Sequence, residues 1–347
     1  MNKDKKNKLL WPILFLVIAA LSVWAIMQQN KSFSLKEFSE FIAGAKISFI
    51  IGAFISVFMY IGFEALALQS ILQIFGYRTG FMSNYFYASG DLYFSAITPS
   101  ATGGQPACGY FMSKDGIPLM VTTIVLIVNT FLYTFSLVIM GLVDIAINPK
   151  TILRFGGLSR FFIIFGILIQ ILLALFFYLL IKKETLLERI CSKFVRFLGK
   201  LRFVKNVDHK IEKINKKMDE YREVAAMISG KSKKLFISLI YNLLMRCSLI
   251  AVSVFVYLAT GNLAADVGKV VSIQIFVIIG AYVIPIPGAI GITDYIMIDG
   301  YKSLFDARHA VNLELLSRTI SFYACVFLCG ILTLLKFILV SRRKKVK

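Results

Sequence analysis

The stretch TPSATGGQPACGY, residues 98–110, decides how this chain folds. It places Pro99, Pro106 and the pair Gly103 and Gly104 inside a sequence that is otherwise strongly apolar. Proline lacks the amide donor that a helix needs, and glycine lets the backbone turn with no side chain in the way. The stretch therefore predicts that the apolar segment Phe81–Thr98 ends here instead of continuing as one long helix.

The surrounding chain has the composition of an integral membrane protein. Of its 347 residues, 58% are hydrophobic, and several long runs carry few charges. A run of about 20 apolar residues forms a helix long enough to cross a hydrocarbon core of roughly 30 Å. Because the apolar runs are continuous and do not alternate with polar residues, we predict an all-α integral membrane protein and not a barrel.

Six segments are predicted to be full transmembrane helices. They are residues 9–27, 41–62, 118–143, 161–181, 235–260 and 319–340. Lysine and arginine are concentrated near the N-terminus, between Lys182 and Lys234, and after Val340. Cytoplasmic loops carry such an excess of basic residues, so we expect both termini and the loop 182–234 on the cytoplasmic side of the plasma membrane. Lys150, Arg154 and Arg160 fit this topology poorly, because it places them outside.

The basic loop 182–234 forms a unit of its own between two membrane halves, 1–181 and 235–347. Its first part, LLERICSKFVRFLGKLRFV at 186–204, alternates apolar and basic residues at helical spacing. This pattern is typical of a helix that lies on anionic lipid. We therefore expect a cytoplasmic helical loop here.

Two apolar segments are not used by the six full spans. Val270–Ile284 has about fifteen residues, or roughly 22 Å of helix, and it stops at PIPGAIG, residues 285–291. Irregular backbone at membrane depth is tolerated only where protein buries it or where it lines a wet cavity. We therefore predict two re-entrant half-helices, with motifs near 81–116 and 270–291, that enter from opposite faces. Such a pair is typical of transporters built from an inverted repeat, with the substrate site near the bilayer midplane.

Three strings carry a resemblance to a known family: ITPSATGGQPACGYFM at 97–112, PIPGAIGITD at 285–294 and LLSRTISFY at 315–323. They resemble the lysylphosphatidylglycerol synthase transmembrane family, also called flippase-like, which is the membrane half of the multiple peptide resistance factor. The likeness covers roughly residues 10–340. The family's second motif usually reads Pro-x-Pro-Gly-Gly-x-Gly-x-x-Glu, whereas Ala289 and Asp294 replace its second glycine and its glutamate here.

The resemblance implies a flippase-like transporter that moves a phospholipid, or a polyprenyl-linked lipid, between leaflets. The phospholipid would be of the phosphatidylglycerol or lysyl-phosphatidylglycerol type. Two alternatives stay open. One is a phosphatidylglycerol lysyltransferase linked to resistance against cationic peptides and antibiotics, although we expect the family's cytosolic aminoacyl-transfer domain to be missing from this chain. The other is a non-transporting protein that presents lipid to a separate synthase. We predict no catalytic residue.

Ionisable residues inside the membrane are costly and are therefore candidates for function. The candidates are Lys46, Glu64, Asp91, Arg246, Asp294 and Arg318. Arg246 lies well inside a span, where its guanidinium would bind two oxygens of an anionic lipid headgroup or form an internal ion pair with Asp91 or Asp294. Lys46 and Arg318 are expected near the outer ends of their helices, and Glu64 at the inner interface. Asp91 and Asp294 would either carry a coupling proton or form ion pairs.

The first motif offers polar groups to an anion. These groups are the hydroxyls of Thr98, Ser100 and Thr102, the amide of Gln105, and the N–H groups of Gly103 and Gly104. A turn of free amides can bind phosphate, but the hydroxyls would otherwise satisfy the backbone of their own loop. In the second motif, Pro287 and Gly288 form the expected tip, and together with Asp294 and Arg318 they complete the predicted substrate-binding residues.

Several other site types are not supported by the sequence. The five cysteines are scattered and the two histidines, His209 and His309, are far apart, so a zinc or haem site is not expected. No Gly-rich loop followed by Lys-Ser/Thr is present, so we expect no nucleotide cofactor, and transport would be ion-coupled or downhill. No nucleic-acid motif accompanies the basic charge. The expected partners are therefore membrane lipids, with a separate lipid-modifying enzyme as a further partner.

Overall fold

The computed structural model describes residues 35–98, 101–182, 192–193, 195–196, 223–261, 264–282 and 286–343. Every regular element in these ranges is helical. Six helices among them are long and apolar enough to cross a membrane: Ile47–Phe75, Leu119–Ile147, Gly157–Ile181, Ser232–Ala259, Ala264–Ala281 and Ala307–Val340. The prediction of an all-α membrane protein is confirmed. The predicted span 9–27 and most of the basic loop 182–234 lie outside the described residues.

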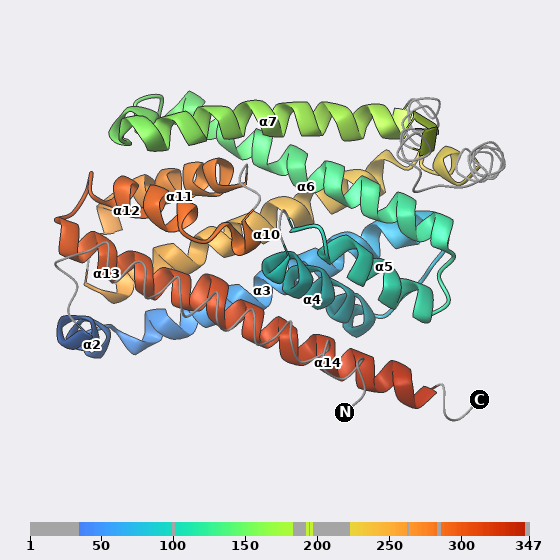
Figure 1. Cartoon of the computed structure of the whole chain (residues 1–347), viewed down its shortest axis with the longest axis horizontal. Helices are drawn as coiled ribbons and strands as arrows, with labels where there is room; N and C mark the ends of the chain where they lie inside the picture. The colour runs from blue at the N-terminus through green and yellow to red at the C-terminus, as the bar shows by residue number, and fades with distance from the viewer. Residues whose placement is uncertain are drawn as a thin grey trace.

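The long helices run roughly along the longest axis of the molecule (Figure 1). They are α3 (Ile47–Leu72), α6 (Leu119–Ile147), α7 (Gly157–Lys182), α10 (Ser232–Ala259) and α14 (Cys325–Arg343). Helices α3 and α10 form the most extensive contact between any two elements. Ile61 and Leu68 from α3 and Val252 and Val256 from α10 are almost fully buried in the core. By contrast, α7 exposes large apolar side chains such as Phe161, which suits a surface against lipid.

The predicted span 41–62 begins and ends too early in the chain. The structure has a short helix α2 (Leu35–Ala43) there, and α3 then continues through Glu64 to Leu72. Glu64 is only 3% exposed, so it lies in the protein interior and not at the inner interface. The prediction ended the span before this carboxylate, whereas the structure gives Glu64 a hydrogen-bond donor from α6 that lowers the cost of burying it.

The last span also begins earlier than residue 319. Helix α13 (Ala307–Arg318) continues through a π-helical turn, η6 (Thr319–Ala324), into α14. The side chain of Asp306 accepts hydrogen bonds from two N–H groups at the start of α13, which fixes the beginning of the helix. Arg318 therefore lies inside a continuous helix and is 8% exposed, so the prediction that it sits near an outer helix end is wrong.

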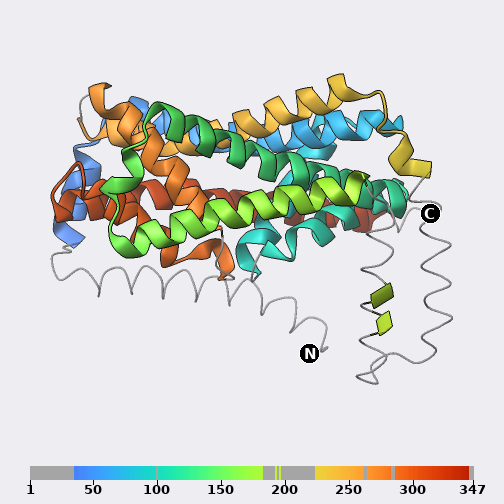
Figure 2. The same ribbon diagram turned by 90° about the horizontal axis from the view of Figure 1, so that it is seen from above.

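Two hairpins of short helices complete the fold. The first is α4 (Phe81–Ile97) with α5 (Gly104–Lys114), and the second is α11 (Val267–Ala281) with α12 (Ile292–Tyr301). In Figure 1 the first hairpin lies toward the end of the molecule where α14 ends, and the second lies toward the opposite end. The turn of the second hairpin, η5 (Pro287–Ala289), contacts α4, and Figure 2 shows the two tips side by side.

Proline explains why α4 stops where it does and why the chain enters the turn of the second hairpin in an extended conformation. The residue before a proline is pushed out of the helical region by a clash with the proline ring. Thr98 precedes Pro99 and is extended, with φ −115° and ψ 145°. Ile286 precedes Pro287 and is extended as well, with φ −103° and ψ 136°. The two tips are thus formed by the same local chemistry.

The order of elements repeats along the chain. Helices of 26, 17, 11 and 29 residues are followed, after α7, by helices of 28, 15 and 10 residues and a long final span. This order fits the expected inverted repeat. Together with the turn Ala264–Asp266, α11 reaches 18 residues and is long and apolar enough to cross a membrane, whereas the predicted segment Val270–Ile284 was too short to do so. Re-entry of the two hairpins into a bilayer stays a prediction.

Candidate functional site

Arg246 is a buried cation at the centre of α10. It is 1% exposed, and its guanidinium carbon lies 3.5 Å from the centre of the Tyr133 ring and 5.5 Å from that of Tyr282. The Nε and Nη2 atoms of Arg246 have no hydrogen-bond partner in the described part of the chain. The two rings therefore stabilise the charge by cation–π interaction while two donors stay unsatisfied.

A chain of buried polar side chains lies beside Arg246 and joins three long helices. Asn129 Nδ2 on α6 donates to Glu64 Oε1 on α3 at 3.0 Å, and Asn242 Nδ2 on α10 donates to Asn129 Oδ1 at 3.4 Å. Asn242 and Arg246 are one turn apart on α10, so they share a face of that helix. Glu64 interacts electrostatically with both Arg246 and Asp91. The predicted site residues Arg246 and Asp91 thus belong to one cluster.

The first motif packs its polar groups against its own hairpin. The Thr98 hydroxyl donates to the Phe94 carbonyl at 2.6 Å and accepts from the Gly103 N–H at 2.9 Å. The Gln105 amide donates to the hydroxyl of Thr130 on α6. These contacts agree with the alternative in which the polar side chains of the loop form hydrogen bonds with its own backbone and with neighbouring helices. Thr102 also has an interaction partner, and Ser100 lies outside the described residues.

Gly104 allows the start of α5 to approach α4 closely. A Cβ atom at this position would overlap Asp91 Oδ1 and Ser95 Oγ. Ser95 Oγ donates to Asp91 Oδ1 at 3.1 Å, so the carboxylate is held beside the first turn of α5. Carboxylates are stabilised near helix N-termini, which explains why Asp91 sits here.

The second motif contains a buried ion pair. Arg318 Nε donates to Asp294 Oδ1 at 2.8 Å, with side-chain exposures of 10% and 3%. Asp294 Oδ2 accepts from the Gly291 N–H at 2.8 Å, and Arg318 Nη2 reaches the Gly288 carbonyl at 3.4 Å. Of the two ion pairs left open for Arg246, the one with Asp294 is therefore excluded, since Asp294 pairs with Arg318.

Gly288 fits closely into this second cluster. Its φ of +61° lies in the left-handed region, and a Cβ atom would overlap the ring of Phe322 on the π-helical turn. Pro287 begins the short turn η5. The structure thus brings the second motif's residues together with Arg318, as expected of a shared site.

Sequence reasoning missed three buried charged residues. Glu314 on α13 is 0% exposed, Asp144 on α6 accepts from Ser272 Oγ at 2.6 Å, and Lys336 on α14 pairs with Asp115 at 2.5 Å. Glu314 was missed because the segment from 307 to 318 looked like a polar loop. Lys336 was missed because a lysine near a helix end is usually able to reach the membrane surface.

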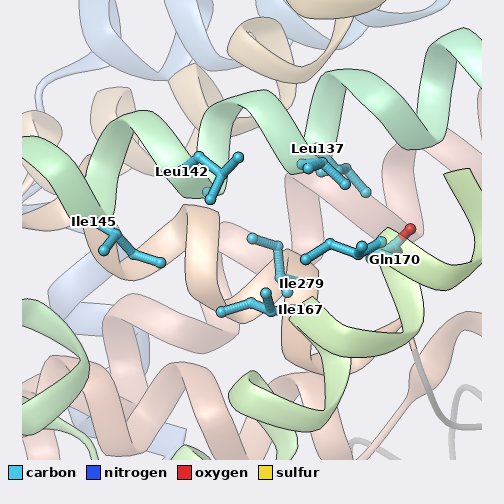
Figure 3. Close-up of a pocket in the computed structure, with 9 residues that line it drawn as sticks. Leu137, Leu142, Ile145, Ile167, Gln170 and Ile279 are labelled. Carbon is cyan, nitrogen blue, oxygen red and sulfur yellow. The ribbon is translucent and has the colours of Figure 1, made fainter. Parts of the chain in front are cut away.

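An apolar crevice lies between α6 and α7, with Ile279 of α11 at its base (Figure 3). Its walls are mainly aliphatic, with Leu142 and Ile145 from α6 and Ile167 from α7, while Gln170 is polar. Leu142 and Ile171 at the crevice are about half exposed, so it opens to the outer surface. Leu137 is one turn from Tyr133 on α6, and Ile279 is one turn from Tyr282, so the crevice ends next to the rings that hold Arg246.

Comparison with known proteins places these features in a family. Residues 12–329 match the family model described as lysylphosphatidylglycerol synthase TM region. No curated protein matches the chain. The matched range includes both hairpins, Arg246 and the Arg318–Asp294 pair. The chain, a multi-pass membrane protein, therefore belongs to the lysylphosphatidylglycerol synthase transmembrane-region family.

Proposed function

We propose that this protein is a flippase-like transporter that moves a phospholipid between the leaflets of the plasma membrane and holds it by its headgroup phosphate. The phospholipid is of the phosphatidylglycerol or lysyl-phosphatidylglycerol type, and both termini face the cytoplasm. The observation that carries this proposal is the buried guanidinium of Arg246 with two donors unsatisfied in the described chain. Buried guanidinium donors without an acceptor are strongly unfavourable, so a matching anion is the expected partner of Nε and Nη2 during function.

A lipid phosphate has the right chemistry for this position. Guanidinium binds phosphate through two parallel hydrogen bonds, and Nε and Nη2 are the pair of donors that lie on one edge of the fork.

The apolar crevice supports a lipid over a small water-soluble anion. Two of its lining residues, Leu137 and Ile279, are one turn from Tyr133 and Tyr282, and its aliphatic walls offer an apolar surface to an acyl chain. Tyr282 is 45% exposed and directly follows α11, so one of the two rings beside Arg246 lies where the tip of the second hairpin begins. A lipid with its headgroup phosphate at Arg246 and its acyl chain in the crevice would fill both the polar and the apolar part of such a site.

Transport is tested with purified protein in liposomes that contain fluorescent phosphatidylglycerol. A membrane-impermeant quencher measures how fast label leaves the inner leaflet. Wild type should exceed empty vesicles, and Arg246→Gln should slow the exchange by about tenfold or more, because a charge-assisted hydrogen bond contributes roughly 1.5–3 kcal/mol. Arg246→Lys should lie between the two, since it keeps the charge but loses the fork.

Arg160→Gln is the matched control. The Arg160 guanidinium also bonds within the protein, with Nε donating to the Phe155 carbonyl at 2.8 Å, but Arg160 lies in the first turn of α7. It should exchange lipid at the wild-type rate. Exchange no faster than in empty vesicles for the wild-type protein would instead favour a lipid-presenting partner of a separate synthase. Lysyl-phosphatidylglycerol formation by the purified protein with charged transfer RNA would favour the lysyltransferase.

A further inference from the structure

Glu314 is a fully buried carboxyl group that the Arg246 site does not use. It lies on α13 with 0% exposure, and neither of its carboxyl oxygens has a hydrogen-bond partner in the described chain. A buried carboxylate with no donor and no cation of its own is strongly unfavourable. These oxygens therefore need a proton or a cation as a partner.

One ionisable neighbour of Glu314 is another acid. Helix α12 packs against α13, and the carboxyl groups of Asp294 and Glu314 interact electrostatically. With both ionised they are two acceptors, which agrees with the lack of any donor to Glu314. Asp294 is already satisfied, because it accepts from Arg318 Nε at 2.8 Å and from the Gly291 N–H at 2.8 Å.

The charges around the pair do not balance. The groups that interact electrostatically with Glu314 are Asp294 on α12, Arg318 on α13, Tyr301 at the end of α12 and Tyr323 on η6. Helix α10 contributes the neutral Ser253, which bonds to Tyr301, and α2 contacts α13 through Phe41 and His309. Two carboxyls thus face a single cation in the described chain.

We propose that Glu314 and Asp294 together bind one exchangeable proton, and that this proton is the coupling ion for lipid movement. The proton adds to a Glu314 oxygen, and the resulting O–H donates to the Asp294 carboxylate. The cluster then carries one negative and one positive charge and is neutral. Two carboxyls at close range cannot both stay ionised cheaply, so sharing one proton is their usual state. The coupling part of the proposal rests on the proposed function, whereas proton binding does not.

The proton site is directly connected to the tip of the second hairpin. Asp294 holds the Gly291 N–H, and Arg318 reaches the Gly288 carbonyl at 3.4 Å. When the proton leaves, Glu314 becomes a second anion that competes for Arg318. The contact between Arg318 and Gly288 then weakens, and the tip is released from α13. The π-helical turn that starts directly after Arg318 is the kind of irregularity that often accompanies functional sites.

Infrared difference spectroscopy of the reconstituted protein tests proton binding independently of transport. Raising the pH should remove the C=O stretch of a protonated carboxylic acid from the wild-type spectrum. Glu314→Gln mimics the neutral acid in shape, so it should fold and lack this band at every pH. Asp299→Asn is the matched control: Asp299 also lies on α12 but accepts from the Gly156 N–H at 2.7 Å, and its variant should keep the band.

A band that persists unchanged in Glu314→Gln would overturn the proposal. A second result would also overturn it: the wild-type protein has no such band, and Na⁺ raises the melting temperature of wild type but not of Glu314→Gln. The site would then bind a metal cation and not a proton. Both outcomes are decided without any lipid assay.

Coupling is tested in liposomes with an imposed pH gradient and labelled phosphatidylglycerol. The gradient should drive wild type to enrich label in one leaflet, whereas Glu314→Gln should only equilibrate it. A gradient response in Glu314→Gln equal to that of wild type would overturn coupling. If no protein moves lipid but the infrared band behaves as expected, the proposed function fails while proton binding stands.

Discussion

Arg318 on the last long helix and Asp294 on the first turn of α12 form a buried ion pair, with Nε 2.8 Å from Oδ1. The pair joins α13 to the tip of the second hairpin, because Asp294 also accepts the Gly291 N–H. The pair connects two motifs that are separate in the sequence: Asp294 belongs to PIPGAIGITD and Arg318 to LLSRTISFY. The strength of this link determines how firmly the hairpin is held.

Removing Arg318 should therefore destabilise the protein. Arg318→Ala leaves the Asp294 carboxylate buried at 3% side-chain exposure with its guanidinium partner gone. Breaking a buried pair on one side costs roughly 3–5 kcal/mol, so the melting temperature in detergent should fall clearly. Lys269→Ala is the control, because the Lys269–Asp266 pair at 2.6 Å is exposed and should contribute about 0–1 kcal/mol. Equal shifts for the two variants would contradict the role of burial.

The sequence predicted the two breaks in the fold because their cause is local. A proline acts on the residue directly before it, and both Thr98 and Ile286 are extended for that reason. Composition likewise predicted a helical membrane protein, since no other structure satisfies the backbone of such continuous apolar runs.

The sequence alone could not predict which residues from distant segments pair with each other. Glu64 and Arg318 were expected near helix ends because a charge inside a span is costly, but each has a partner from another helix, Asn129 and Asp294. Glu314 was overlooked because its segment, residues 307–318, has the sequence of a polar loop. Which charges are compensated depends on packing between elements, and neither periodicity nor composition reports that packing.

Ala289 offers a test of the backbone at the second tip. Its φ of +48° lies in the left-handed region, which costs an L-residue roughly 1–2 kcal/mol. Ala289→Gly should relieve this strain, although glycine also gains freedom in the unfolded chain. We expect a net stabilisation of up to about 1 kcal/mol, measured as a higher melting temperature.

Ala88→Gly is the control for the glycine effect itself. Ala88 lies within the helix α4, where glycine should destabilise by about 1 kcal/mol. If both variants lowered the melting temperature equally, the strain at Ala289 would not be real.

Gly104 tests the close approach of α5 to α4. Because a Cβ atom there would overlap Asp91 Oδ1 and Ser95 Oγ, Gly104→Ala should force the two helices apart. Overpacking of this kind costs roughly 1–3 kcal/mol. The effect should appear as a lower melting temperature in detergent.

Gly268→Ala provides the comparison, since nothing lies within 4 Å of a Cβ atom at Gly268 on α11. This variant should be neutral or slightly stabilising. An equally benign result at Gly104 would mean that the hairpin has room to adjust, and Asp91 would not be held as tightly as described.

The environment of Asp306 predicts how the melting temperature changes at low pH. Its carboxylate accepts from the N–H groups of His309 and Arg308, each at 2.9 Å, and these bonds hold the pKa of Asp306 below its ordinary value. A lowered folded-state pKa means that this capping contribution is present above the unfolded-state pKa and is lost as pH falls through the folded-state pKa. Asp306→Asn keeps an acceptor oxygen but does not titrate. Melting temperatures measured from about pH 5 down to about pH 3 should therefore fall more steeply for wild type than for Asp306→Asn. Parallel curves would show that the ionised carboxylate does not cap α13.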